Sequence, residues 1–271
     1  MEQLQAGPLR QTRVCFERCL RAFVNDRGCK TFLSVALITV LIGMVMGGDT
    51  FKGYAATRNG AFALVCACIW IGIFNSIRTI CRERDILRRE HRTGLNLWSY
   101  MAAHWIYEAL LSMAEAVVVV LIVRVMCYDH FVTRGVLLPP TLEMGVTFFL
   151  IIFSADALGL LISSIVHSEN TAMTVMPFAL IVQLVMSGTI FELSGLPDAI
   201  SNLTISRWGL DAICATAHVN EMLEVGMGYV EALPEQAAST SNLLALWGLL
   251  AFFAAVYGVL AAAFLHLVDR G

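Results

Sequence analysis

Long apolar runs separated by short polar segments dominate the pattern of this 271-residue chain. A helix needs about 20 mostly apolar residues to cross a bilayer, because each backbone amide must find its partner within the segment. The period-two alternation of a membrane β-barrel is absent. The pattern therefore predicts an all-α polytopic membrane protein with six transmembrane helices, at residues 31–48, 59–77, 105–123, 144–166, 171–191 and 242–267.

Composition strengthens this interpretation. Hydrophobic residues make up 58% of the chain and charged residues 14%, with a mean hydropathy of +0.73. A soluble domain usually contains about 45–50% apolar residues. The chain is therefore expected to be an integral membrane protein.

The distribution of basic residues predicts the orientation. Six arginines lie between Arg78 and Arg92, in a polar segment between two apolar runs. With both termini in the cytoplasm, 13 of the 18 Lys and Arg residues fall on the inner side and 5 on the outer side. Since Lys and Arg accumulate in short cytoplasmic segments, we expect a multi-pass protein of a cell membrane with both termini inside. A bacterial inner membrane is the expected location.

The first 30 residues are predicted to form a cytoplasmic amphipathic connecting helix. Phe16, Leu20, Phe23 and Val24 recur at helical spacing, and arginines occupy the other face. This pattern is typical of a helix that lies along a membrane surface. The alternative, a solvated basic tail, explains the charges but leaves the phenylalanines unexplained. Residues 31–271 are then the six-helix transmembrane domain.

Two segments outside the predicted spans carry further structure. Residues 80–94 mix both signs of charge over a helical length, which favours a cytoplasmic helix that docks on a charged protein surface. The alternative is a plain positive-inside anchor. In the large outer loop, about 192–241, the semi-apolar residues 199–217 predict a re-entrant or interfacial helix with Trp208 at headgroup level.

Residues for enzyme chemistry or metal binding are missing from the sequence pattern. The six histidines show no H-E-x-x-H spacing, and the eight cysteines form no metal-ligand pattern. A disulfide between Cys127 and Cys214 is left as an alternative. A phosphate-binding Walker A loop needs Lys after Gly, but Lys30 follows Cys29 and Lys52 follows Phe51. We expect no catalytic residues, no metal site and no nucleic-acid partner; a membrane enzyme ranks behind two classes of transporter.

Four segments resemble a known family in the same order. They are similar to the coupling-helix segment and later segments of ABC transporter permeases of the type-2 membrane family, especially G-subfamily (White-like) half-transporters and their bacterial relatives. The segments are RERDILRREHRTGLNLWSY at 82–100, DALGLLISSIVHSENTAM at 156–173, PFALIVQLVMSGTIF at 177–191 and LPDAISNLTISRWGLDA at 196–212.

The resemblance implies a permease that pairs with a second copy, as a homodimer or a similar heterodimer, among membrane lipids. It also implies an ABC nucleotide-binding domain that carries ATP and magnesium, so no cofactor is expected in this chain. No such domain precedes residue 1, which implies either a separate ATPase polypeptide or a fused domain that has been removed. The residues implied to couple to the ATPase are Arg82, Glu83, Arg84, Arg88, Arg89, Glu90, His167, Ser168, Glu169 and Asn170. Those implied to line a substrate path at the dimer axis are Leu64, Cys68, Ile71, Asn75, Ile181, Leu184 and Val185.

Two acidic residues leave a second functional class open. Glu115 and Asp156 lie near the middle of predicted spans, where an ionised carboxylate costs at least about 2.5–3.5 kcal/mol on insertion scales. They are expected to be neutral and hydrogen-bonded between helices, or to partner Arg124, unless they form a protonatable transport site. The leading hypothesis is an ATP-driven exporter of an amphipathic or lipid-like substrate. The alternative is a proton-coupled secondary transporter, although no internal repeat of the kind common in such carriers is evident.

Overall fold

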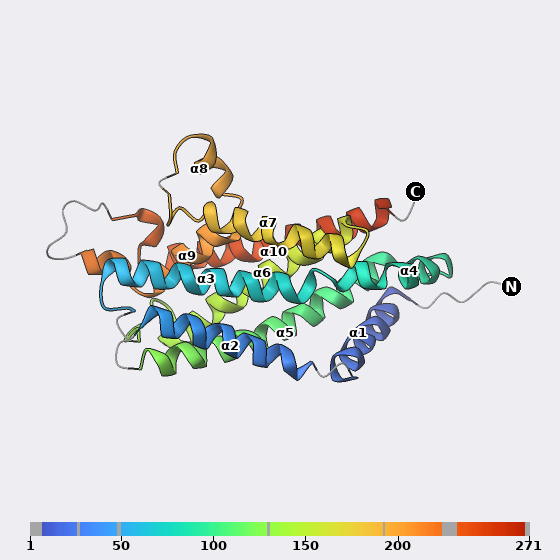
Figure 1. Ribbon diagram of the computed structural model, residues 1–271, viewed down its shortest axis with the longest axis horizontal. Helices are drawn as coiled ribbons and strands as arrows, with labels where there is room; N and C mark the ends of the chain where they lie inside the picture. Colours follow the sequence, from blue (N-terminus) through green and yellow to red (C-terminus); the bar gives the residue numbers. More distant parts are fainter. Residues whose placement is uncertain are drawn as a thin grey trace.

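The computed structural model describes residues 7–25, 28–47, 50–128, 131–191, 193–223 and 232–268, and within these ranges the chain folds as an elongated helical bundle without strands (Figure 1). The predicted all-α fold is confirmed. Of the predicted outer loop at 192–241, residue 192 and residues 224–231 lie outside the described ranges.

Five helices are long and apolar enough to cross a membrane, as judged by length and composition. They are α2 (Cys29–Met46), α3 (Tyr54–Ser76), α5 (Leu97–Met126), α6 (Pro140–Ile165) and α10 (Thr240–Val268). The fifth predicted span, 171–191, corresponds to α7 (Glu169–Val185), which has only 17 residues. It ends earlier than predicted because the chain turns at Gly188, whose φ of 73° lies in the left-handed region that glycine favours. A sixth crossing therefore stays a prediction.

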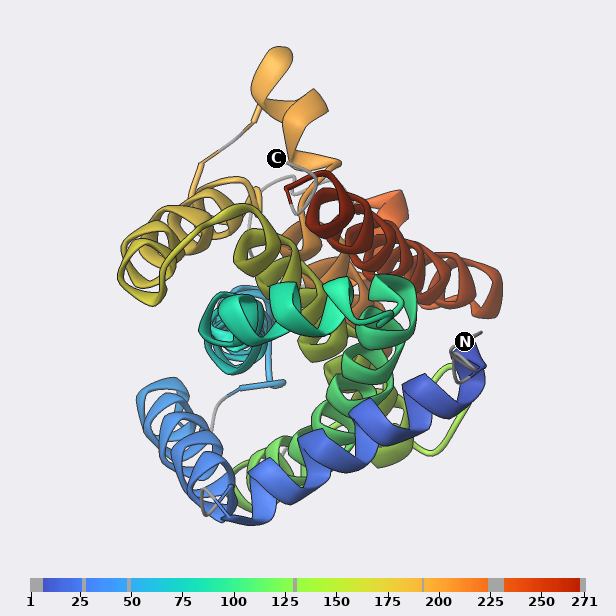
Figure 2. The same cartoon turned by 90° about the vertical axis from the view of Figure 1, so that its right-hand side faces the viewer.

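Helix α6 lies at the centre of the bundle, with α3, α5 and α10 packed around it (Figure 2). The approach of α3 to α6 is very close. A Cβ added to Gly72 would lie 2.4 Å from the Ile152 carbonyl oxygen, and one added to Gly159 would lie 2.1 Å from Ser76 Oγ. Membrane helices use small residues in this way, because lipid offers no hydrophobic drive for their association and backbone contact must supply it.

The end of the bundle that carries α8 (Leu196–Ser201) and α9 (Ile205–Thr216) is held by side-chain bonds to α7. Gln183 is buried within the apolar helix α7, where its Oε1 accepts the Ser206 backbone N–H at 3.1 Å. This bond satisfies an amide in the first turn of α9, which has no partner within its own helix. Helix α9 is almost wholly buried against α3, α6 and α10, so a re-entrant position fits better than an interfacial one.

The opposite end carries α1 (Pro8–Asn25), α4 (Thr79–Arg92) and the end of α10 (Figure 1). Helix α4 continues the direction of α3 beyond the bundle, and the chain then turns back at Gly94, whose φ is 107°. Gln11 of α1 fixes this turn, because its side-chain amide donates to the Gly94 carbonyl and accepts the Asn96 N–H at 2.8 Å.

We predict that Gly72→Ala destabilises the bundle, because the new methyl group would meet backbone atoms of α6 that have no freedom to move. Overpacking of this kind costs about 1–3 kcal/mol, on the order of 2–10 °C in thermal midpoint. Gly248→Ala is the matched control, since its Cβ would meet nothing within 4 Å. Thermal unfolding of the detergent-purified protein measures both changes, and equal midpoints for the two variants would contradict the close packing.

Candidate functional site

Helix α4 is anchored by α6 at the end of the bundle that carries α1. Ser163 Oγ accepts the backbone N–H groups of Ile80 and Cys81 at 3.0 and 3.1 Å, and so caps the first turn of α4 from a neighbouring helix. Arg84, only 4% exposed, donates to the Ser164 carbonyl. A displacement of α4 is therefore transmitted directly to α6.

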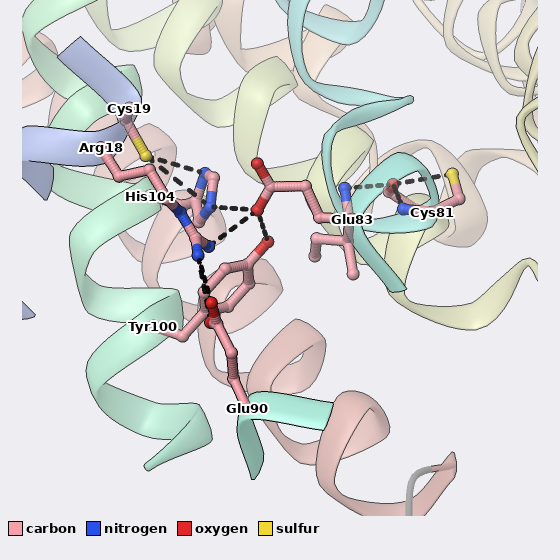
Figure 3. Close-up of polar contacts among 9 residues, drawn as sticks. Arg18, Cys19, Cys81, Glu83, Glu90, Tyr100 and His104 are labelled. Atoms are coloured by element: carbon pink, nitrogen blue, oxygen red, sulfur yellow. Dashed lines mark hydrogen bonds and ion pairs between the residues drawn. The ribbon is translucent and has the colours of Figure 1, made fainter. Parts of the chain in front are cut away.

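A second link joins α4 to α1 and α5 through Arg18 (Figure 3). One terminal nitrogen of Arg18 bonds both carboxylate oxygens of Glu90, and the other bonds Glu83, each at 3.0 Å. Glu83 also accepts the Tyr100 hydroxyl at 2.9 Å and lies 3.9 Å from His104 Nε2. One arginine thus joins two turns of α4, while Glu83 joins α4 to α5.

Electrostatics favour a charged arginine and a protonated thiol at this junction. Burial alone would lower the pKa of Arg18, but Glu83 and Glu90 outweigh that effect and raise it above its ordinary value. Burial raises the pKa of the Cys19 thiol to about 12. Cys19 is therefore protonated at neutral pH and suits the sulfur contact with His104 Nδ1 at 3.7 Å. The cluster is a structural joint.

The outer face of α4 is mostly basic, with one apolar side chain at its centre. Ile86 is 53% exposed, and it lies one turn from both Arg82 and Arg89. The sequence analysis did not single out Ile86. The signal was present, because Ile86 is apolar but does not lie on the helix face that Ile80 and Leu87 share. The exposed side chains of α4 are Arg82, Asp85, Ile86, Arg88, Arg89 and Arg92.

The residues predicted to meet an ATPase divide into two groups. Arg82, Arg88 and Arg89 face outward. So do His167 and Ser168 in the short connection before α7, and Glu169 and Asn170 in the first turn of α7, which Ser168 caps. Glu83, Arg84 and Glu90 instead turn toward the bundle and bond to other elements. The prediction that these three residues contact an ATPase directly is therefore corrected: they hold α4 in place.

An apolar groove of about 200 Å³ lies between α3 and α7. Cys66, Ile69 and Trp70 line its α3 side, and Ile181 and Leu184 line its α7 side. Ile181 is 56% exposed. The structure thus brings two of the three predicted path residues of α7, Ile181 and Leu184, together with α3, whereas Val185 is not among the residues that line the groove.

On α3, however, the predicted path residues lie on the wrong face of the helix. Leu64 and Cys68 are fully buried in the main core. Ile71 and Asn75 line a separate hollow of about 450 Å³ between α2 and α3. The sequence could not fix the face because α3 is apolar on nearly all sides, so its periodicity does not distinguish core from groove. Cys66 and Trp70 line the α3 side of the groove instead.

Three acidic side chains gather inside the bundle. Glu115 accepts both bonds from Asn75 of α3, at 2.8 and 3.0 Å, and Asp156 accepts Ser112 of α5 at 2.5 Å. Glu108, which the prediction did not single out, is buried within electrostatic range of both carboxyls. Arg124 is no partner of theirs, since it bonds Thr141 at the helix end. The hydrogen-bonded arrangement between helices is the one observed.

Comparisons with known proteins agree with this geometry. The sequence profile of the ABC-2 type transporter family matches residues 10–217. The chain is also 30% identical over 227 residues to ABC transporter ATP-binding/permease protein Rv1747 of Mycobacterium tuberculosis. That alignment covers 79% of this chain and 26% of the relative, so the chain spans about a quarter of the relative's length.

We predict that Arg18→Gln loosens α1 and α4 together, because two turns of α4 lose their shared cation. Amide hydrogen exchange in both helices should accelerate about three- to tenfold, since charge-assisted bonds no longer oppose local opening. Arg13→Gln is the matched control, because Arg13 pairs with Glu17 on its own helix. Equal exchange of α4 in the two variants would show that Arg18 does not hold it.

Proposed function

This chain belongs to the ABC-2 type transporter family and is a membrane subunit of an ABC transporter; from that premise we propose that it exports an amphipathic or lipid-like molecule, driven by ATP hydrolysis elsewhere. The ATP and its magnesium ion would bind an ABC nucleotide-binding domain, either a separate polypeptide or a domain fused to this one. Both termini would lie in the cytoplasm of a bacterial inner membrane.

The attachment of α4 is the observation that carries this proposal. A helix with an exposed basic and apolar face is fixed at its start to α6 through Ser163 and along its length to α1 through Arg18. An ATPase that closes against this face would displace α4, and these bonds would pass the displacement to the bundle. Two exposed residues at the start of α7, His167 before the helix and Glu169 in its first turn, would complete the docking surface.

A second permease copy would complete the substrate path. The groove between α3 and α7 leaves Trp70, Ile181 and Leu184 exposed on one face of the molecule. Two copies that face each other across these helices, as a homodimer or with a similar permease, would enclose an apolar channel for a lipid-like molecule. Surrounding membrane lipids would cover the remaining apolar surface.

The interior acids support a second candidate, a proton-coupled secondary transporter. Glu108, Glu115 and Asp156 are buried together and could share protons during a transport cycle. The ATP-driven proposal is preferred because Glu115 and Asp156 are engaged by Asn75 and Ser112, and the groove lies elsewhere.

We predict that Arg88→Glu and Ile86→Asp each reduce ATP-driven transport at least about fivefold, because each places a negative charge on the face that would meet the ATPase. Transport into vesicles, assayed with the cognate ATP-binding domain, measures the loss. Arg134→Glu is the control, since Arg134 lies at the other end of the molecule, where it pairs with Glu221. Full transport by both α4 variants would remove α4 from the coupling surface.

We predict opposite effects of a bulky side chain at two positions. Ile181→Trp should change which substrates are transported while thermal stability stays within a few degrees, because a groove wall has room. Cys68→Trp should unfold or strongly destabilise the protein, because Cys68 is fully buried. Paired substrate-competition and thermal-unfolding measurements test this; a severe loss of stability in Ile181→Trp would place Ile181 in a packed core instead.

A further inference from the structure

A second cavity lies at the end of the bundle opposite α4, next to the end of the α3–α7 groove. Its volume is about 220 Å³, and Ser187 and Gly188 on its wall lie one turn beyond Leu184 of the groove. The groove is apolar, whereas this cavity is polar. Its charged and amide-bearing lining residues are Arg58, Asp198, Arg207, Asp211, Glu235 and Gln236.

The charges in this cavity are only partly neutralised. Arg207 is bound to Asp198 at 2.5 Å and also donates to Ser201, so this pair is internally satisfied. Arg58 donates to the Gly188 carbonyl at 3.1 Å but forms no ion pair within the described residues. Asp211 likewise forms no ion pair there. Burial raises its pKa to about 6, and Gln236, Arg207 and Arg58 oppose that rise, so most of it is ionised at neutral pH. Arg58 and Asp211 therefore influence each other across the cavity without forming an ion pair.

Two buried polar atoms of the lining are left without a partner in the described structure. Gln236, 1% exposed, donates its amide nitrogen to Asp211 at 2.9 Å, which leaves its Oε1 as an unused acceptor. Arg58 Nε is an unused donor. Unmet groups of this kind cost about 1–3 kcal/mol each, so a ligand that satisfies them gains affinity.

We propose that this cavity binds the headgroup of an amphipathic molecule that carries both a primary ammonium and an oxyanion, with its apolar tail in the α3–α7 groove. The oxyanion pairs with Arg58, and the ammonium donates to Asp211 and Gln236. A quaternary ammonium fits poorly, because it has no N–H to give to the two acceptors. At about 220 Å³ the cavity suits a headgroup, since cavities that hold drug-sized molecules measure about 300–1,000 Å³.

This inference deepens the proposed transport function, because it names a class of substrate. It rests on that function only in treating the bound molecule as the one that is transported. Binding itself requires neither ATP nor the nucleotide-binding domain. A binding assay on the purified full chain therefore separates the two ideas. If the chain is transport-competent but does not distinguish lipid headgroups in the binding assay, this inference alone is overturned. If it distinguishes headgroups but shows no ATP-driven transport, the proposed function alone is overturned.

The test uses native mass spectrometry of the detergent-purified chain with an equimolar mixture of phosphatidylethanolamine and phosphatidylcholine that share the same acyl chains. We expect about tenfold preferential retention of phosphatidylethanolamine, the usual effect of a charge-assisted hydrogen bond. Arg58→Gln should weaken retention of both lipids, because the oxyanion partner is lost. Asp211→Asn should reduce the preference to about twofold or less, and Gln236→Leu, which removes the second acceptor of the ammonium, serves as the test if Asp211→Asn unfolds.

Arg134→Gln is the matched control and should retain the tenfold preference, because Arg134 lies outside the cavity and pairs with Glu221. Equal retention of the two lipids by the unaltered chain, or a preference that survives both in Asp211→Asn and in Gln236→Leu, would overturn the proposal. A further arm adds soluble glycerophosphoethanolamine as competitor. Weak competition supports a site that needs the tail, whereas competition as strong as that of the lipid supports the headgroup cavity and overturns the role of the groove.

Discussion

The close approach of α3 to α6 at Gly72 and Gly159 is the constraint on which the rest of the structure depends. Each helix leads directly into one part of the site: α3 continues into α4, and α6 leads through the short connection at 166–168 into α7. Because the two backbones touch, neither helix moves far without the other. The helix that would meet an ATPase and the helix that lines the groove are thus parts of one mechanical unit.

Polar side chains inside the apolar bundle serve mainly as fasteners between helices. Ser163 caps α4, Gln183 caps α9, and Asn75 and Ser112 engage buried carboxyls. In a membrane an unmet polar group is costly, so each such bond fixes a helix at a defined position. The cavity near Arg58 differs, because there an unmet donor and an unmet acceptor belong to residues that line a polar cavity of about 220 Å³. This difference distinguishes a candidate ligand site from bonds that only hold helices together.

The sequence predicted features that charge or helix breakers mark strongly, and it failed where every face of a helix is apolar. The charged helix predicted at about 80–94 occurs as Thr79–Arg92. The prediction of which face of α3 lines the groove was wrong, since apolar residues surround the whole helix. The inward turn of Glu83 also escaped prediction, because its partner Arg18 lies 65 residues away. The cavity formed by Arg58, Asp211 and Gln236 joins residues from three distant segments, and only the folded structure brings them together.

The central claim is that this chain supplies the path and the coupling surface while another domain supplies the energy. The most direct test measures ATP hydrolysis and vesicle transport by the purified chain, first alone and then with its ATP-binding domain. The account predicts neither activity from the chain alone and both activities from the pair, with transport unaffected by collapse of a proton gradient. ATP hydrolysis by the chain alone, or transport driven by a proton gradient without the ATP-binding domain, would contradict it.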